Sequence, residues 1–338
     1  MKRILFFFLP AILVLVWIGF TFIPRHYEVP AMKPLSEMRY WRLSTGSRLA
    51  YVHKQGKGNK KNIPVIFLQG GPGGFITDST RFLDFVTEEG YDLYLYDQVG
   101  SGHSDRLKDI NEYTAERHVM DLDEIAKSIG AEKLILVGQS WGAILATLYA
   151  ADHPDKIEKL ILTGPGPVVP INHALESILP PDTLSVQKPK FTNKMANEKV
   201  SNMRVKMVGL LAQWLGAKLA GDQEMDAYQT RLNNELNKST VADPAMAKPA
   251  EGGGGYYVQI KTMQSLATAK DPRVKLANNL IPTLILRGEY DNQPWGFVTE
   301  YFDLFKQHRF RLIKGAGHAI PREQKQRYEA EIRSFLNE

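Results

Sequence analysis

The sequence of 338 residues contains no cysteine. This absence excludes disulfide bonds, zinc–thiolate sites, iron–sulfur clusters and a cysteine nucleophile. No pair of histidines has the spacing of a metal-binding motif, so we expect neither a metal nor another cofactor. A strong charge of one sign is also missing, because 42 Lys and Arg stand against 37 Asp and Glu, a formal net charge of +5. That small excess does not indicate a nucleic acid as a partner.

Long hydrophobic runs are scarce, and the longest lies at the N-terminus, where residues 4–23 carry no charged side chain. A helix of about 20 residues spans about 30 Å, which is the hydrocarbon thickness of a bilayer. A cleaved signal peptide has a shorter apolar core, about 7–15 residues, and a small-x-small cleavage site, which does not follow this run. We therefore predict a single-pass transmembrane anchor at residues 1–24, with a signal sequence as the alternative.

The charges beside this run indicate how the chain would cross the membrane. Lys2 and Arg3 precede the run, and basic residues favour the cytoplasmic side, although Arg25 on the other side weakens the asymmetry. We therefore expect a membrane-anchored protein whose remaining residues are periplasmic or otherwise extracytoplasmic. Residues 25–38, with prolines and little periodicity, are predicted to be a linker.

The rest of the chain, residues 39–338, has the pattern of an α/β domain. Residues 39–45 and 48–54 alternate apolar and polar side chains around a Thr-Gly-Ser turn, which predicts a β-hairpin. Short, continuous apolar runs follow, typical of strands buried on both faces of a parallel sheet. Helical patterns lie between them, so we expect about eight strands in a mostly parallel sheet. The predicted parallel strands are residues 64–69, 91–97, 133–138, 158–163, 282–287 and 308–314.

One long stretch interrupts this alternation. Between residues 165 and 275 there is no run typical of a parallel strand, whereas residues 200–219 and 222–236 have helical patterns. We predict a helical cap at about residues 166–275, inserted into the catalytic domain. The four consecutive glycines at 252–255 are interpreted as a flexible turn, with a functional hinge as the alternative.

The clearest chemical motif is G-x-S-x-G at residues 138–142, between a predicted strand and an Ala-rich helix. Small residues two positions away on either side allow the chain to turn sharply and to present the Ser140 hydroxyl above the sheet. The following helix N-terminus favours developing negative charge there. We therefore predict that Ser140 is a nucleophile.

A serine nucleophile needs a base and an orienting acid, which in this arrangement follow in the order Ser, Asp or Glu, His. Asp291 follows the predicted strand at 282–287 and is the favoured acid, with Glu289 as the rival. His318 follows the next strand, after a Gly-Ala-Gly loop, and is the favoured base. The other histidines, including His118, are interpreted as structural or surface residues.

An oxyanion hole needs two backbone N–H groups aimed at the developing charge. The first is expected from Trp141, the residue after the nucleophile, and the second from the glycine-rich loop at residues 69–74, directly after an early strand. Glycines let the backbone approach a substrate closely. A phosphate-binding loop is disfavoured, because no Gly-Lys-Ser/Thr follows.

Taken together, these motifs resemble the α/β-hydrolase superfamily, and within it the proline iminopeptidase branch, peptidase family S33. The matching segments are Gly-Gly-Pro-Gly-Gly at 70–74, Asp-Gln-x-Gly-x-Gly-x-Ser at 97–104, Gly-Gln-Ser-Trp-Gly at 138–142 and Gly-x-Gly-His at 315–318. The resemblance implies a Ser140–His318–Asp291 triad and oxyanion donors at Gly71 and Trp141. It also implies that Asp97 braces neighbouring loops.

The sequence departs from this family at several positions. Gln69 stands where the family usually has His, and Val99 where it commonly has Arg. The cap lacks the Trp-x-x-Trp-Glu motif near the glutamates with which iminopeptidases bind a free N-terminal amine. Glu235 and Glu251 are possible substitutes, although the favoured interpretation of both is a solvated cap residue.

The favoured function is thus a serine hydrolase that releases N-terminal residues from small peptides. Hydrolysis of carboxylic or lipid-like esters is the alternative, and a non-catalytic binding protein on the same fold is a remote one. The expected partners are a small molecule or short peptide as substrate and the membrane, through the N-terminal helix. The sequence carries no indication of oligomeric state.

Overall fold

The computed structural model describes residues 19, 21–33 and 35–338. The anchor predicted at residues 1–24 lies almost entirely outside them. Among the helices described, none is both long enough and apolar enough to cross a membrane. The anchor therefore stays a prediction from the sequence.

The described part of the chain forms one eight-stranded sheet in the order β1-β2-β4-β3-β5-β6-β7-β8. The predicted hairpin is confirmed by β1 and β2, which pair antiparallel with Arg42 opposite Arg48, and β2 pairs antiparallel with β4. All other neighbours are parallel, which confirms the mostly parallel sheet. The strands are β1 (Arg39–Arg42), β2 (Arg48–Lys54), β3 (Val65–Leu68), β4 (Leu93–Tyr96), β5 (Leu134–Gln139), β6 (Ile157–Thr163), β7 (Thr283–Tyr290) and β8 (His308–Gly317).

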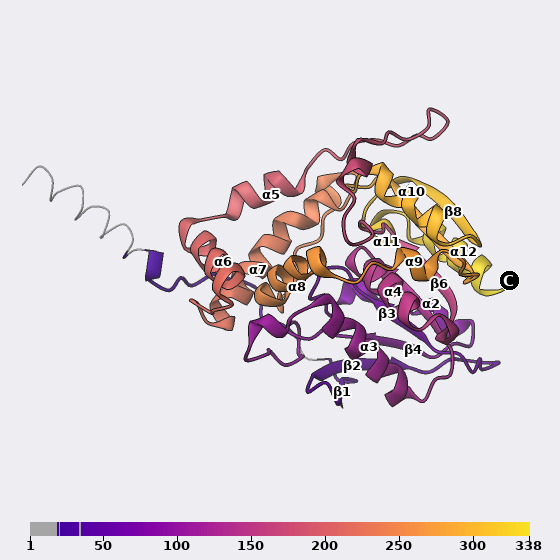
Figure 1. Ribbon diagram of the computed structural model, residues 1–338, viewed down its shortest axis with the longest axis horizontal. Coiled ribbons are helices and arrows are strands. Elements are labelled where there is room, and N and C mark those ends of the chain that lie inside the picture. The colour runs from indigo at the N-terminus through magenta and orange to yellow at the C-terminus, as the bar shows by residue number, and fades with distance from the viewer. Residues whose placement is uncertain (1–18, 20, 34) are drawn as a thin grey trace, which may run out of the picture.

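Helices cover both faces of this sheet (Figure 1). Alternate residues of β3 pack on opposite faces: Ile66 and Leu68 join the core beneath α3 (Ala115–Ile129), α4 (Trp141–Asp152) and α10 (Trp295–Leu304). Val65 and Phe67 join the core beneath α2 (Phe85–Glu88) and α12 (Lys325–Leu336). Burial on both faces explains why the central strands are continuous apolar runs.

Helix α3 shows how local sequence sets these elements. The Thr114 hydroxyl accepts the Arg117 N–H at 3.0 Å and caps the N-terminus, and Gly130 ends the helix with a φ of 71°. Between these ends, Leu122 and Ile125 lie on the buried face. Helix α3 is thus one of the helices expected between the predicted strands.

The cap lies between β6 and β7 in the chain and is the part of the molecule beside the described N-terminal segment, residues 21–33 (Figure 1). Its longer helices are α5 (Asn193–Val200), α6 (Met203–Leu215), α7 (Asp222–Leu236) and α8 (Tyr256–Ser265). Two four-residue helices complete the set, α9 (Arg273–Leu276) beyond the cap and α11 (Ile320–Glu323) before α12. The 3₁₀ turns are η1 (Asp78–Leu83), η2 (Ile110–Glu112), η3 (Pro154–Lys156), η4 (His173–Ser177), η5 (Asn237–Ser239), η6 (Pro244–Met246) and η7 (Leu266–Thr268).

Residues 21–33, which we call the N-terminal strap, overlap the linker predicted at residues 25–38 and pack on the cap. Tyr27 is buried, its ring lies 5.6 Å from that of Tyr228, and its hydroxyl accepts a hydrogen bond from Asn202 at 3.1 Å. Arg204 donates to the Thr21 carbonyl at 3.0 Å. Aromatic packing and charged hydrogen bonds thus fix the position of a segment whose sequence has little periodicity.

The glycines at 252–255 are likewise packed rather than free. A Cβ at Gly252 would overlap the Pro30 carbonyl of the strap, and one at Gly255 would overlap the Gly100 carbonyl. Gly253 adopts a φ of 103°, and its carbonyl accepts the Gly102 N–H at 2.8 Å. The glycines therefore permit a close approach of three backbone segments.

Candidate active site

Ser140 occupies a sharp turn between β5 and α4. Its φ of 55° makes it the one non-glycine residue with positive φ in the described part of the chain. A Cβ at Gly142 would overlap the Leu68 carbonyl, and one at Gly138 would lie 2.5 Å from the Gly142 oxygen. Such a backbone costs on the order of 1–3 kcal/mol and persists only where surrounding contacts enforce it. The structure thus contains the strained turn that the G-x-S-x-G pattern predicts.

His318 and Asp291 come together at the C-terminal ends of β8 and β7. His318 Nδ1 lies 2.9 Å from Asp291 Oδ1, and both side chains are buried. Burial alone would raise the pKa of Asp291, but His318, Arg287 and the Gln293 N–H together hold it below its usual value. The carboxylate is therefore stabilised as an anion at the imidazole.

The rival acid, Glu289, has other partners. Its carboxylate accepts the Ser185 hydroxyl at 2.5 Å and the Gly315 N–H at 2.8 Å. The serine hydrogen bond, together with the Gly315 N–H, holds the pKa of Glu289 below its ordinary value. The structure thus places Asp291 beside His318. Glu289 instead holds the loop at Gly315 that precedes His318.

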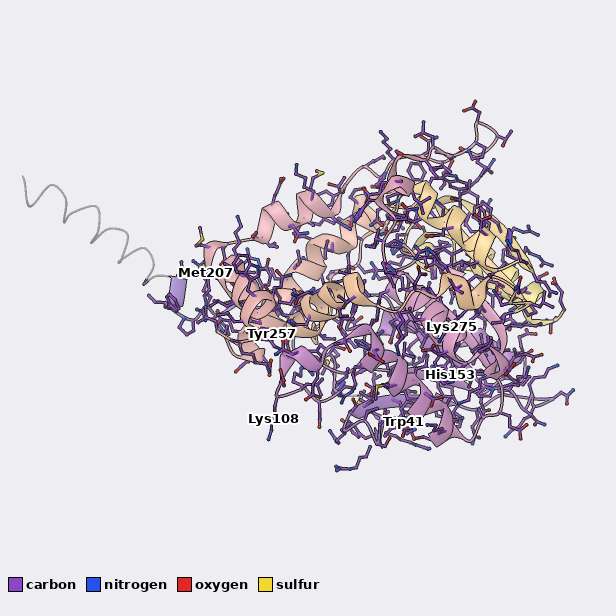
Figure 2. All side chains as sticks on the ribbon, in the orientation of Figure 1. Trp41, Lys108, His153, Met207, Tyr257 and Lys275 are labelled. Atoms are coloured by element: carbon purple, nitrogen blue, oxygen red, sulfur yellow. The ribbon has the colours of Figure 1, made fainter. Side chains whose placement is uncertain are left out.

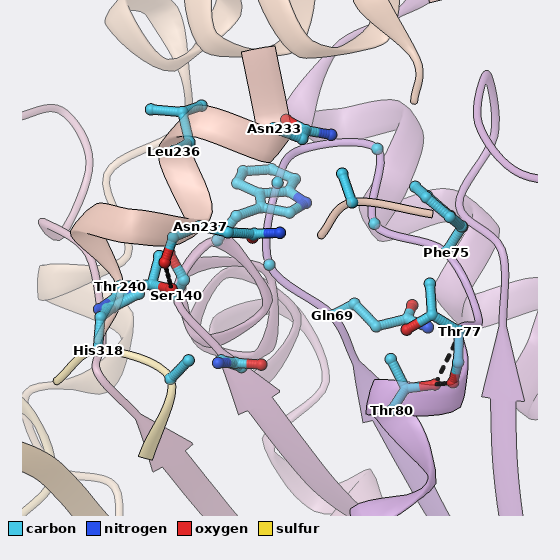
Figure 3. A pocket seen from close by; sticks show the side chains of 18 of the residues that line it. Gln69, Phe75, Thr77, Thr80, Ser140, Asn233, Leu236, Asn237, Thr240 and His318 are labelled. Carbon is cyan, nitrogen blue, oxygen red and sulfur yellow. Dashed lines mark hydrogen bonds between the residues drawn. The ribbon is translucent and has the colours of Figure 1, made fainter. Parts of the chain in front are cut away.

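Ser140 and His318 line the same cavity, of about 800 Å³ (Figure 3). The glycine-rich loop at residues 70–74 forms one wall, and a Cβ at Gly70 would lie only 3.3 Å from the Ser140 Cβ. The cap closes the opposite side. Its labelled lining residues in Figure 3 are Asn233, Leu236, Asn237 and Thr240.

The two segments that carry the predicted oxyanion donors are linked by Gln98, a residue whose role the sequence did not reveal. The buried Gln98 carbonyl oxygen accepts the Gly73 N–H at 2.9 Å and the Trp141 indole N–H at 3.0 Å. Its amide donates to the Gln69 carbonyl at 2.9 Å. Gln98 therefore ties the glycine-rich loop to the start of α4, where the Trp141 backbone N–H has no intrahelical acceptor.

Asp97 lies beside this bridge and accepts two backbone N–H groups, those of Ile76 and His103, both at 2.6 Å. The carboxylate is fully buried. It therefore connects the loop after β3 to the loop after β4, as the family resemblance implied.

Arg287 is a second residue that the sequence did not single out. It is buried in β7, its guanidinium carbon lies 5.7 Å from the centre of the Trp295 ring, and Nη2 donates to the Gln293 carbonyl at 2.5 Å. Its pKa is lowered by burial. Even so, its charge is one of the causes that keep Asp291 ionised.

His118 has a structural position, as interpreted from the sequence. It is buried between α3 and the cap, edge-on to the Trp141 ring at 5.4 Å, with Nε2 lying 3.2 Å from the Thr262 hydroxyl of α8. Burial, and secondarily the charge of Arg117, lowers the pKa of His118 to about 3. The imidazole is therefore neutral at physiological pH.

Of the two candidate cap glutamates, only Glu251 lines the cavity. Glu235 is paired with Lys199 at 3.0 Å and Lys238 at 2.8 Å, and these hydrogen bonds outweigh desolvation and lower its pKa. Among the residues described, no group of three or more His, Asp or Glu side chains is arranged to hold a metal ion.

A mostly parallel sheet of this order, with a serine in a strained turn between a central strand and a helix, defines the class of α/β-hydrolases. The model of the alpha/beta hydrolase fold family matches residues 63–323. The chain therefore belongs to that family and is a hydrolase.

Its sequence is similar to proline iminopeptidases over most of its length. The enzyme from Flavobacterium johnsoniae is 24% identical over 317 residues, which cover 92% of this chain and 97% of that relative. The enzyme from Saccharolobus solfataricus is 24% identical over 305 residues, covering 87% and 90%. These relatives support the proline iminopeptidase-like character of the chain.

Solved structures extend the likeness of fold. An esterase from Exiguobacterium antarcticum superposes with a TM-score of 0.60 at 17% identity, covering 88% of this chain and 99% of the esterase. The epoxide hydrolase CorEH superposes with a TM-score of 0.59 at 17% identity, covering 89% and 98%. At such identities the likeness establishes the fold alone.

Proposed function

We propose that the protein is a serine hydrolase in which Ser140 is the nucleophile, His318 the base and Asp291 the orienting acid. The observation that carries this proposal is the buried 2.9 Å contact between His318 and Asp291, in the cavity where Ser140 stands on its strained turn. The three residues follow the chain order of this class, each at the C-terminal end of a strand.

In the proposed reaction, Ser140 Oγ attacks the substrate carbonyl carbon while His318 Nε2 accepts the hydroxyl proton. Asp291 holds the imidazole in the required tautomer and stabilises the imidazolium. The backbone N–H groups of Gly71 and Trp141 donate to the oxyanion. His318 then protonates the leaving group, and water hydrolyses the acyl-enzyme by the same steps in reverse order.

For the substrate we propose a short peptide with a free N-terminus, from which one residue is released. The similarity to proline iminopeptidases along almost the whole chain supports this choice. Glu251 is the cap carboxylate available to a substrate amine, because it lines the cavity whereas Glu235 is paired with two lysines.

Ester hydrolysis is the second candidate, and the lining of the cavity favours it. Among the described lining residues only Asp78 and Glu251 carry carboxylates, which is little for a site that binds an amine. Carboxamides are far more numerous there, and they bind neutral substrates as well as peptides. They are Gln69, Gln139, Asn193, Gln229, Asn233, Asn237, Gln259, Asn292 and Gln293.

The proposal is tested with Ser140→Ala, with the exposed Ser177→Ala as control. We expect Ser140→Ala to lose turnover by about 10⁴-fold or more and to lose labelling by a fluorophosphonate, because no nucleophile remains. Ser177→Ala should keep both. Full activity in Ser140→Ala, with unchanged thermal unfolding, would refute the triad. Comparing proline and alanine arylamides with short acyl esters on the wild-type protein then separates peptidase from esterase.

The N-terminal run supports one further part of the proposal, a single-pass anchor with an extracytoplasmic catalytic domain. Protease added outside intact spheroplasts should then degrade the domain, and alkaline carbonate should leave the chain in the membrane pellet. Protection from the protease, or release by carbonate, would contradict this localisation.

A further inference from the structure

Helix α6 of the cap exposes apolar side chains to solvent. Trp214 and Leu215 are 80% and 70% exposed, and Met203 and Leu210 are exposed as well. Met203, Met207, Leu210 and Trp214 recur at intervals of three and four residues, which places them on one side of the helix. We call these four residues the α6 stripe.

The other side of α6 is already buried in the cap. Val205, Val208 and Ala212 join the hydrophobic core, and Tyr256 of α8 donates to the Val205 carbonyl at 3.4 Å. A surface helix of a soluble domain ordinarily carries polar residues opposite its buried side. Here both sides are apolar, and contiguous exposed apolar patches mark interaction surfaces. The α6 stripe therefore needs a partner.

The end of the N-terminal apolar run lies against this helix. Arg204, at the start of α6, donates to the Thr21 carbonyl and forms an ion pair with Glu224, which also accepts the Arg25 N–H at 2.9 Å. In Figures 1 and 2 the strap runs beside α6, and Met207 is labelled next to it. Phe22 and Ile23 of the strap are 47% and 54% exposed. Apolar groups from two distant parts of the sequence thus adjoin.

We propose that the α6 stripe lies in the interface of a lipid bilayer, beside the point where the N-terminal run enters it. The run at residues 4–23 is long enough to span the hydrocarbon core, and it ends at Phe22 and Ile23 next to α6. Tryptophan is enriched at the membrane interface, which suits Trp214. The exposed cations Lys206 and Arg25 are suited to anionic lipid headgroups.

This arrangement gives the domain a fixed orientation on the membrane. A lone anchor followed by a free linker would let the domain rotate relative to the membrane. With the strap and α6 together, the domain contacts the bilayer at two places. The cap then lies between the bilayer and the catalytic sheet (Figure 1). Helix α8, which lines the cavity with Gln259 and Met263, packs directly on α6. The inference is independent of the chemistry at Ser140.

The absence of cysteine makes a direct test simple. Single cysteines replace Leu210 or Trp214 in the full-length chain, and Val274→Cys serves as control. Val274 is apolar and 85% exposed, but it lies on α9, remote from α6 (Figure 1). Each cysteine carries a nitroxide, and the protein is reconstituted into vesicles of phosphatidylcholine and phosphatidylglycerol. Far-ultraviolet circular dichroism and thermal unfolding verify that each variant is folded.

Collision rates of the nitroxide with oxygen, which enters lipid, and with a nickel chelate, which stays in water, give the result. We expect the oxygen-to-nickel ratio at residues 210 and 214 to exceed that at 274 several-fold. Equal ratios at all three positions would overturn the proposal, as would failure of the chain to float with the vesicles. Protection from both reagents would also overturn it, because protein then covers α6. In that case, dilution with unlabelled chain would show whether the protein that covers α6 is a second copy of the chain or residues 4–20 of the same chain.

Discussion

The catalytic core and the cap contribute to the same cavity, but they hold their side chains in different ways. In the core, Ser140, Asp291 and His318 stand at strand ends, and a buried network fixes each of their loops. In the cap, the lining side chains come from helices and turns and include the neutral amides of Asn193, Gln229, Asn233, Asn237 and Gln259. The difference indicates that the core determines which bond is attacked, whereas the cap determines which molecule is bound.

The charged residues of the core and of the cap also have different roles. The core places the buried Arg287 near Asp291, whose anion it stabilises. In the cap, Glu224 and Glu235 are engaged by cations and support the helices rather than the cavity. Substitutions in the core should therefore change the rate for all substrates alike, and substitutions in the cap should change one substrate relative to another.

After the loss of the nucleophile itself, the largest effect on kcat is expected from Asp291→Asn. An asparagine holds the imidazole in the wrong tautomer and cannot stabilise the imidazolium, so kcat should fall by about 10⁴-fold. The loss should be equal for arylamides and esters, as measured by steady-state kinetics on each. A loss confined to one substrate would contradict the view that the core acts on all substrates alike and that the cap selects among them.

Glu289→Gln is the matched control for Asp291→Asn. Its carboxylate accepts the Ser185 hydroxyl and the Gly315 N–H but does not contact His318, so we expect a loss of tenfold at most, about 1.4 kcal/mol. A loss as large as that of Asp291→Asn would show that Glu289 is the orienting acid.

Features set by local sequence could be predicted. The strand runs and the turn around Ser140 each depend on a few adjacent residues and on one period of hydrophobicity. Asp291 and His318 were predictable because strand ends of a parallel sheet meet at one edge.

Features that depend on distant segments could not be predicted. Gln98 bridges the glycine-rich loop and Trp141, and Arg287 acquires its role only when β7 is buried beside Trp295. The contacts of the glycines at 252–255 and of the strap could not be predicted for the same reason. Each segment packs against backbone that is distant in the sequence.

The second largest effect is a pH dependence of stability. It arises at the boundary between core and cap, where His118 of α3 contacts Thr262 of α8. Burial lowers the pKa of His118 to about 3, below the value of about 6.5 in an unfolded chain. Between these values the unfolded state binds more protons, so stability is full above about pH 6.5 and falls as the pH is lowered. At pH 5 the loss should be about 2 kcal/mol.

The variant His118→Gln separates this effect from general acid denaturation, since glutamine keeps a hydrogen-bonding group but does not titrate. Denaturant unfolding at pH 7 and pH 5 should show that the wild type loses about 2 kcal/mol more than the variant. Identical losses in both proteins would mean that His118 does not couple the cap to the core through its protonation.

The smallest effect, a change in KM, is expected from Glu251→Gln. It tests directly whether the cap selects the substrate. If Glu251 binds the substrate amine, the substitution replaces a charged hydrogen bond by a neutral one, and KM for amino-acid arylamides should rise by about tenfold. Acyl esters, which lack the amine, should keep their KM, and kcat for both should change little. Glu235→Gln is the matched control, because its carboxylate is held by Lys199 and Lys238. Unchanged kinetics in Glu251→Gln would remove the amine-binding role and leave ester hydrolysis as the function that the carboxamide-rich lining favours.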